Sequence, residues 1–142
     1  MVVRLHNQSA LIADHKETLL RLTKWMCREL QLKVHSIDVI FTNDSVLKEM
    51  HKTYLNNNSY TDVMTFNLSD DEYIEGEIYI SVERTKDQAL RYKVPVINEI
   101  SRLIVHACLH LSGIDDKHHQ EKIIMKRQED AYLKKVEDLF LN

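Results

Sequence analysis

Two histidines lie four residues apart near the end of an apolar segment, at His106 and His110. On a helix this spacing puts both imidazoles on one face, one turn apart, where they can chelate a single divalent ion. Gly113 then marks a helix end at which the chain can turn back. Four residues after this turn are candidates for a third ligand: Asp115, Asp116, His118 and His119. Three protein ligands with an open position are typical of catalytic zinc, whereas structural zinc has four.

The residues before the histidines predict that this helix is buried. Pro95 precedes the segment, where the first turn of a helix accepts proline without losing a hydrogen bond. Polar imidazoles beside a buried stripe need partners, and a metal ion serves both rings at once. The alternative is that the two histidines are structural residues, since a chain with eight histidines forms helical pairs by chance. The apolar stripe consists of Val96, Ile97, Ile100, Leu103, Ile104, Ala107 and Leu111.

The histidine spacing is also that of the zinc-protease signature HExxHxxGxxH, but one position argues against peptide hydrolysis. In that signature a glutamate directly follows the first histidine and acts as the general base. This chain has Ala107 there, which can neither accept nor donate a proton. The sequence therefore keeps the spacing of the ligands without the chemistry of the protease.

Two further motifs accompany the histidines: residues 61–66 read TDVMTF and residues 76–81 read GEIYIS. Together with residues 106–116, HACLHLSGIDD, they resemble the YbeY family of metal-dependent endoribonucleases, whose motifs are close to TDVLSF, GDIxIS and HGxLHLxGYDH. The likeness in length and element order covers nearly the whole chain. It implies an enzyme that cleaves single-stranded regions of ribosomal RNA, notably at the 3′ end of the small-subunit RNA, in rRNA maturation and ribosome quality control.

The chain departs from the family at the third ligand. The family has a histidine ten residues after the first one, where this chain has Asp116. A carboxylate oxygen binds zinc at about 2.0–2.2 Å, so we expect His106, His110 and Asp116 to hold one Zn²⁺-type ion per chain. His118 and His119 stay open as alternative third ligands. A harder oxygen ligand also widens the choice of metal.

A second departure concerns the grip on RNA phosphate. Many family members have an arginine six residues before the first Thr of the strand motif, where this chain has Leu55. No arginine occurs between Arg28 and Arg84. The candidate RNA contacts are therefore cations elsewhere: Lys52, Arg84, Lys86 and Arg102.

Length and composition predict one domain spanning residues 1–142. A chain of this length buries on the order of two-thirds of its unfolded surface. The first residues turn polar too soon for a signal peptide, and no run approaches the ~18 apolar residues that cross a bilayer. Cys27 and Cys108 are isolated thiols on helical patterns, and Cys108 is expected to point into the core, away from the metal. We therefore expect a cytoplasmic protein without membrane contact.

The net charge of −3 argues against a simple basic nucleic-acid binder. A metalloenzyme tolerates this balance, because the ion is often the largest charge in its site. Arg84, Lys86, Arg91 and Lys93 form one basic run. That run is either a solvated helix face or a patch that contacts phosphate.

Periodicity and turn residues predict an α+β domain with a roughly four-stranded mixed sheet, about five helices covering it, and the metal site at the end of a buried helix. The predicted strands are residues 2–6, 37–41, 62–67 and 77–80. The predicted helices are residues 14–30, a short helix capped by Asn43 or Asp44 that runs toward Tyr54, a helix from the N-cap Ser81 to Tyr92, the histidine helix, and residues 121–139. The last helix has the apolar members Ile124, Ala131, Leu133, Val136 and Phe140.

The expected mechanism is metal-assisted cleavage of a phosphodiester. The ion would lower the pKa of its bound water toward ~7, polarise a phosphoryl oxygen, or stabilise charge on the phosphate if the RNA 2′-hydroxyl attacks. No catalytic group is assigned beyond this metal-bound water, and Glu99 and Glu77 stay open as general bases. Asp62 is either a structural residue at the end of a strand or a partner that orients a histidine ring.

Two rival functions stay open. One is a metal-dependent hydrolase of another substrate class. The other is a ribosome-associated RNA-binding protein with a structural metal, for which the ribosome or ribosomal proteins are the expected partners. An open coordination position distinguishes a catalytic metal from a structural one.

Overall fold

The computed structural model describes residues 1–7 and 9–142, except for the side chain of residue 11. It contains four strands: β1 (Val2–His6), β2 (Val34–Thr42), β3 (Val63–Asn67) and β4 (Ile74–Ser81). Its helices are α1 (Ala10–Ala13), α2 (Lys16–Glu29), α3 (Asp44–Leu55), α4 (Val82–Tyr92), α5 (Val96–Leu111) and α6 (His119–Phe140). Among the described residues no helix is both long and apolar enough to span a membrane.

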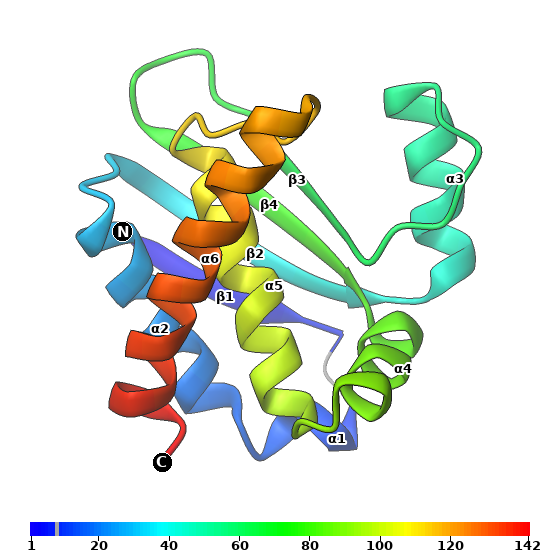
Figure 1. Cartoon of the computed structure of the whole chain (residues 1–142). Helices are drawn as coiled ribbons and strands as arrows, with labels where there is room; N and C mark the ends of the chain where they lie inside the picture. The colour runs from blue at the N-terminus through cyan, green and yellow to red at the C-terminus, as the bar shows by residue number, and fades with distance from the viewer. Residues whose placement is uncertain (8) are drawn as a thin grey trace.

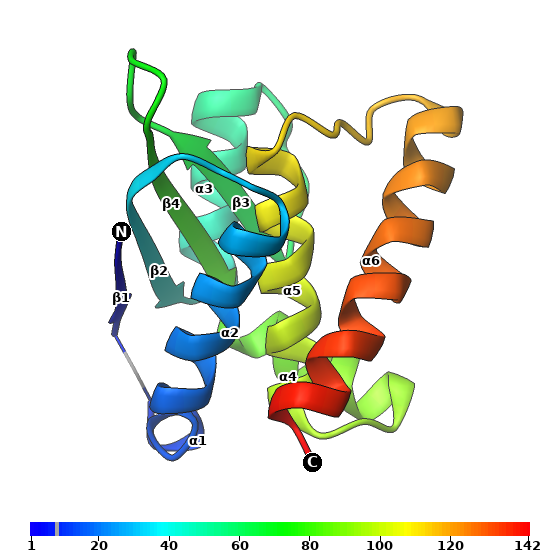
Figure 2. The same ribbon diagram turned by 90° about the vertical axis from the view of Figure 1, so that its left-hand side faces the viewer.

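The four strands form one mixed sheet in the order β1-β2-β4-β3. β1, β2 and β4 run parallel, whereas β3 is antiparallel to β4 and forms an edge. Figure 2 shows α2, α5 and α6 on one side of the sheet, and Figure 1 shows α3 beyond the β3 edge. Helix α5 lies at the centre of this arrangement, because it contacts α2, α4, α6, β3 and β4.

The fold confirms the predicted α+β class and its mixed four-stranded sheet. Five helices have eleven residues or more, and the four-residue α1 precedes them. Two strands begin three residues before their predicted starts, β2 at Val34 and β4 at Ile74. The two strands are longer than predicted because their backbones already pair at Val34 and Ile74. These residues precede the alternating apolar segments that identified the strands.

Helix α5 is buried on nearly all sides, more completely than its predicted stripe. Ile100, Leu103, Ile104 and Ala107 of that stripe are buried. Other faces of the helix are buried as well, through Ser101, Val105, Cys108 and Leu109. Cys108 is therefore in the core as expected, and both cysteines are free thiols. A helix packed this tightly tolerates polar side chains only where a partner meets them.

Local capping fixes the ends of the helices that surround the site. Asn43 accepts a hydrogen bond from the Val46 amide at 2.9 Å, and Ser81 accepts one from the Arg84 amide at 3.1 Å, so both serve as N-caps. α5 ends in a Schellman motif, in which the Gly113 amide donates to the His110 carbonyl and the Ile114 amide to the Leu109 carbonyl. Gly113 has φ +105°, which side chains rarely adopt, so glycine is required for this turn.

The other glycine lets α5 approach the sheet. A Cβ at Gly76 in β4 would lie 2.7 Å from Ile37 Cδ1 and 3.1 Å from Leu111 Cδ1. Leu111 is the last residue of α5 and directly follows His110. The absent side chain at position 76 therefore lets the last turn of the histidine helix rest on β4.

We expect Gly76→Val to lower the free energy of unfolding by about 1–3 kcal/mol, because the added atoms overpack this contact. Urea denaturation measures the change. Glu75→Val is the matched control on the exposed neighbouring residue, where a surface change is expected to stay within about 0.5 kcal/mol. Equal stability of the two variants would contradict a close contact between α5 and β4 at this position.

Candidate functional site

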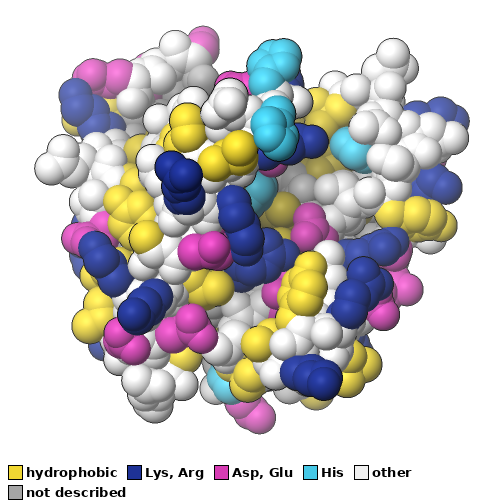
Figure 3. Space-filling model, viewed as in Figure 1, with side chains coloured by type: hydrophobic (Ala, Val, Ile, Leu, Met, Phe, Trp, Pro, Cys, Tyr) yellow, Lys and Arg dark blue, Asp and Glu magenta, His cyan; other side chains and the backbone are white. Residues whose placement is uncertain are grey.

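A cavity of about 730 Å³ lies between the end of α5, strand β3 and the last turns of α3. Its α5 side carries His106, His110 and Leu111, and the loop after α5 adds residues 115–117. The opposite wall is the segment from Thr61 to Asn67, and α3 adds His51 and Leu55. Figure 3 shows histidine side chains near the start of α6 and across from it toward α3, around a hollow in the surface.

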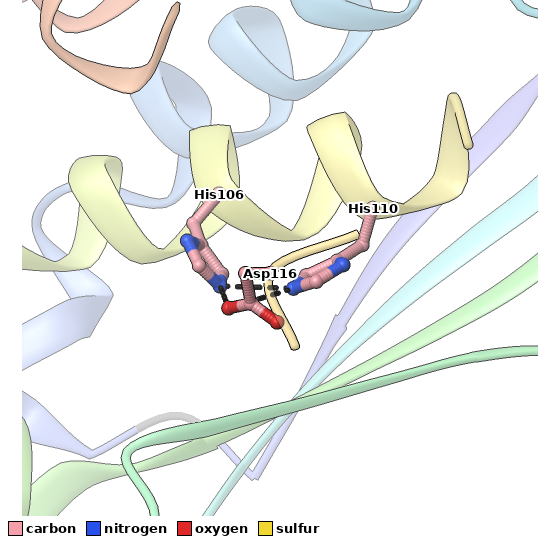
Figure 4. Close-up of side chains that lie close together, drawn as sticks. All are labelled: His106, His110 and Asp116. Carbon is pink, nitrogen blue, oxygen red and sulfur yellow. Dashed lines mark hydrogen bonds and ion pairs between the residues drawn. The ribbon is translucent and has the colours of Figure 1, made fainter. Parts of the chain in front are cut away.

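Three of the predicted ligands converge in this cavity (Figure 4). The Nε2 atoms of His106 and His110 are 3.1 Å apart. Asp116 Oδ2 lies 3.6 Å from His106 Nε2 and 3.5 Å from His110 Nε2. Ligand atoms at about 2.0–2.2 Å from a tetrahedral zinc ion are about 3.3–3.6 Å from one another. The two distances to Asp116 fall in this range, and the distance of 3.1 Å between the two Nε2 atoms is slightly shorter.

Among the described residues, the other candidates for the third ligand do not join this cluster. The Asp115 side chain accepts a hydrogen bond from the Asp116 amide at 2.8 Å, although Asp115 also lines the cavity. His118 is the N-cap of α6 and His119 its first residue, and both are exposed. The turn at Gly113 brings residue 116 back to the end of α5, whereas residues 118 and 119 have already entered the next helix.

A buried carboxylate orients the first histidine. Glu129 on α6 lies with Oε2 at 2.8 Å from His106 Nδ1, and its side chain is almost fully buried. Because a carboxylate accepts, we assign the Nδ1 proton to His106, which leaves its Nε2 lone pair directed at the ligand cluster. Carboxylate–histidine pairs of this kind set the tautomer and ring orientation of metal ligands.

Arg102 extends this contact into a chain of charges along α5. Its Nη1 donates to Glu129 Oε1 at 2.7 Å, and its Nη2 donates to Glu99 Oε1 at 2.5 Å. Burial by itself raises the pKa of Glu129, but hydrogen bonds from His106 and Arg102 outweigh it and hold that pKa below its ordinary value. Burial lowers the pKa of Arg102, and the bonds to Glu99 and Glu129 raise it further than burial lowers it. Each charge in this buried row is therefore compensated.

Glu129 is a functional residue that the sequence analysis missed. Glu129 lies on the inward face of α6 with Met125 and Val136, and this position is the feature that could have identified it. Of the predicted apolar members of α6, Val136 is buried and Leu133 and Phe140 are half-buried, whereas Ile124 and Ala131 are exposed. Because the polar Glu129 occupies an inward position of the helix, the apolar pattern alone does not reveal it.

The two glutamates considered as general bases do not line the cavity. Glu99 is held by Arg102 and by Gln88, whose Nε2 donates to Glu99 Oε1 at 2.8 Å. Glu77 alternates with the buried Ile78 along β4 and so faces away from α5. It accepts a hydrogen bond from the Tyr79 hydroxyl at 2.9 Å, and burial together with this contact raises the pKa of Tyr79 to about 12.

Among the described residues Asp62 forms no hydrogen bond with a histidine ring; its Oδ2 instead accepts a hydrogen bond from Gln88 Nε2 at 3.2 Å. The same oxygen lies 3.5 Å from Arg102 Nη2. Asp62 also lines the cavity, directly before β3. Its contacts fit the structural role at a strand end, joining β3 to the charged row of α5.

The four cations proposed as RNA contacts are spread over three helices, and none of them lines the cavity. Lys52 is exposed on α3, and Lys86 is exposed on α4. Arg84 Nη2 donates to Asp44 Oδ2 at 2.8 Å, and Arg102 is engaged in the charged row. Among the described residues that line the cavity, Lys117 is the one lysine or arginine. Lys117 could not be identified from the sequence, because no helical or strand pattern marks a residue of that loop.

His51 is a second cavity residue that the sequence did not reveal. Its Nδ1 lies 3.0 Å from the carbonyl oxygen of Ser59. A carbonyl only accepts, so Nδ1 carries the proton and Nε2 keeps its lone pair. The loop of residues 56–59 thus orients an imidazole with a free acceptor on the α3 side of the cavity.

We expect Glu129→Gln to weaken zinc binding by about 10–100-fold, because the amide orients His106 less firmly than a carboxylate does. It should also lower the free energy of unfolding by about 1–3 kcal/mol at pH 7, since Arg102 loses a buried charged partner. Competition with a chromophoric chelator measures the affinity. Asp130→Gln, at the exposed neighbour on α6, is the control and should leave zinc affinity unchanged.

The difference in the free energy of unfolding between the wild type and Glu129→Gln should depend on pH. The folded pKa of Glu129 is lowered, so its carboxylate stabilises the fold at pH values above the ordinary glutamate pKa of about 4.3. That contribution is lost as the pH falls through the lowered pKa. Urea denaturation of the wild type and of Glu129→Gln should therefore show that their difference in the free energy of unfolding becomes smaller below about pH 4.3. A difference that grew below this pH would contradict the lowered pKa of Glu129.

The chain is similar in sequence to proteins of one known family. The family model described as "Endoribonuclease YbeY" matches residues 4–137. The chain is 43% identical over 100 residues to the endoribonuclease YbeY of Karelsulcia muelleri, covering 70% of this chain and 71% of that protein. It is 30% identical over 134 residues to the Chlorobium phaeovibrioides protein of the same name, covering 94% and 90%.

A solved structure shares the fold. The solution structure of TM1509 from Thermotoga maritima superposes with a TM-score of 0.62 at 24% identity, covering 97% of this chain and 90% of that chain. The match of the family model over most of the chain, together with relatives that are 30% and 43% identical, decides the assignment. The chain belongs to the endoribonuclease YbeY family.

Proposed function

We propose that this chain is a metal-dependent endoribonuclease that cleaves single-stranded RNA in the cavity beside α5. The convergence of His106, His110 and Asp116 carries this proposal, because their ligand atoms face an open cavity and no fourth ligand joins them among the residues that the structure describes. Family membership supports the reaction class. We further propose ribosomal RNA, at the 3′ end of the small-subunit RNA, as the substrate, with the ribosome as partner in the cytoplasm.

We propose Zn²⁺ as the ion. Two imidazole nitrogens and one carboxylate oxygen are a donor set that zinc accepts, and the separations of 3.5 and 3.6 Å from Asp116 to the two rings fit a tetrahedral ion. When bound, such an ion supplies Lewis-acid polarisation of the phosphate. The protein contributes the orientation of the ligands: Glu129 fixes the His106 ring, and the turn at Gly113 returns Asp116 to the end of α5.

Other cavity residues are proposed to hold the RNA. Lys117 follows Asp116 in the loop and places a cation at the edge of the cavity. Leu55 occupies the position of the arginine found in many family members, and it also lines the cavity. An apolar side chain cannot neutralise a phosphate, so this cation must come from another element, and the structure favours the loop after α5.

We propose His51 as the general base. Its Nε2 takes the proton of the attacking hydroxyl while that oxygen bonds to phosphorus and the bond to the leaving oxygen breaks. The proton then passes to the leaving oxygen, so that the imidazole is regenerated. The bond from Nδ1 to the Ser59 carbonyl supports this role, because it keeps the acceptor nitrogen free.

Elemental analysis tests the ligands. We expect about one zinc per chain in the wild type, and loss of it in His106→Ala, His110→Ala and Asp116→Ala. RNA cleavage should disappear with the metal and on chelation, and return to the wild type on addition of zinc. The matched control is His119→Ala, which removes an exposed histidine close in sequence and should keep both metal and cleavage. Retention of cleavage by purified His110→Ala would place the activity elsewhere.

A pair of variants tests His51. An asparagine amide can still donate to the Ser59 carbonyl but has no group in place of Nε2, so we expect His51→Asn to lower kcat by about 10²-fold or more with unchanged zinc content. His51→Ala should lose the same activity and regain part of it with added imidazole, which a merely structural role would not produce. A kcat of His51→Asn close to that of the wild type would exclude this base.

A further inference from the structure

A second concave surface lies on α2, away from the cavity at α5. It is lined by Arg21, Lys24, Trp25, Arg28 and Phe140, and its volume is about 400 Å³. We call these five residues the α2 surface. It shares no residue with the α5 cavity. Figure 1 shows α2 and the C-terminal end of α6 on the side of the molecule opposite α3.

The charge of the α2 surface is of one sign. Arg21, Lys24 and Arg28 follow one another at intervals of three and four residues, so their side chains form one stripe along the helix. No carboxylate is among the five lining residues. The protein as a whole carries a net charge of −3, so this stripe is a local concentration of positive charge on a protein that is not basic overall.

These cations are free of carboxylate partners in the part of the chain that the structure describes. Exposed cations on other helices pair with acids one turn away, as Arg91 does with Asp87 at 2.8 Å and Lys126 with Asp130 at 2.9 Å. Within residues 1–7 and 9–142 no carboxylate oxygen is within 4.0 Å of a side-chain nitrogen of Arg21, Lys24 or Arg28. Glu17 and Glu29 lie on the same helix and leave the stripe unpaired.

Aromatic rings form the remainder of the α2 surface. Trp25 is half-buried and packs edge-on against Phe140, with ring centroids 5.9 Å apart, and against Tyr132 at 6.5 Å. The Arg21 guanidinium lies 5.5 Å from the centre of the Phe140 ring. The rings are thereby held in place while Trp25 and Phe140 still line the concavity. A fixed aromatic surface beside unpaired cations is the combination that binds single-stranded nucleic acid.

We propose that the α2 surface binds a single-stranded segment of RNA outside the cleavage cavity. The seven helical steps from Arg21 to Arg28 span about 10.5 Å, a length that a few consecutive nucleotides of one strand cover. The three cations can thus contact phosphates of consecutive nucleotides, and Trp25 offers a surface for a base or ribose. This inference rests on the proposed RNA substrate, and it adds phosphate contacts on α2 to the one proposed for Lys117 in the α5 cavity.

The test compares two double variants that remove the same charge. Arg21→Gln/Arg28→Gln alters the α2 surface, and Arg91→Gln/Arg127→Gln removes two exposed arginines that line neither cavity. Fluorescence anisotropy in EDTA, which prevents cleavage, measures binding of unstructured RNA of about 20 nucleotides as a function of salt. We expect the α2 variant to weaken binding about tenfold or more and to reduce the slope of log K against log salt by about 1.4, at ~0.7 per phosphate.

The outcomes separate this proposal from the proposed function. Cleavage of a short RNA of about 6 nucleotides, which can occupy the α5 cavity alone, reports the proposed function and should be equal in the wild type and both variants. If the two variants weakened the binding of long RNA equally, the effect would come from the overall charge of the protein, and the proposal would be overturned. Unchanged binding by the α2 variant would also overturn it, and would leave an acidic protein partner as the occupant to seek. Absence of short-RNA cleavage in the wild type would instead count against the proposed function.

Discussion

The hydrogen bond between His106 and Glu129 is the contact on which the site depends. Helix α5 is buried so completely that any polar side chain on it must meet a partner, and an unpaired one would be costly. Glu129 satisfies His106 with one oxygen and Arg102 with the other, so a single residue of α6 serves two buried polar groups of α5. This shared carboxylate joins the packing of the last helix to the orientation of a ligand ring, and it makes fold stability and metal affinity linked properties.

The same helix explains where the chain uses glycine. The sequence contains two glycines, and both act on the last turn of α5. Gly76 leaves room for Leu111 against β4, and Gly113 adopts the φ of +105° that ends the helix and turns the chain back. One glycine thus sets the distance of the histidines from the sheet, and the other sets the position of Asp116. A site assembled from a helix end and a returning loop needs both, because a side chain at either position would shift one ligand relative to the other two.

The α5 cavity and the α2 surface differ in the sign of the charges that line them. The α5 cavity is lined by Asp62, Asp115 and Asp116 against the one cation Lys117 among its described lining residues, so it repels phosphate unless a divalent ion offsets the carboxylates. Leu55 adds no charge to this wall. The unpaired cations of the described α2 helix lie on another side of the molecule. Attraction of RNA and its cleavage are therefore assigned to separate surfaces, which reconciles a net charge of −3 with an RNA substrate.

Much of the local structure was determined by the sequence itself. The spacing of His106 and His110, the helix stop at Gly113 and the caps Asn43 and Ser81 are short-range features, because a helix turn or a cap depends on residues within four positions. The same reasoning predicted the mixed sheet and the burial of α5. The tertiary structure alone decided which distant residues meet the ligands. Glu129 lies 23 positions from His106, and His51 and Lys117 come from an element and a loop with no periodic signal of their role. Such contacts depend on how helices pack across the sheet, and packing between distant segments leaves no fixed spacing in the chain.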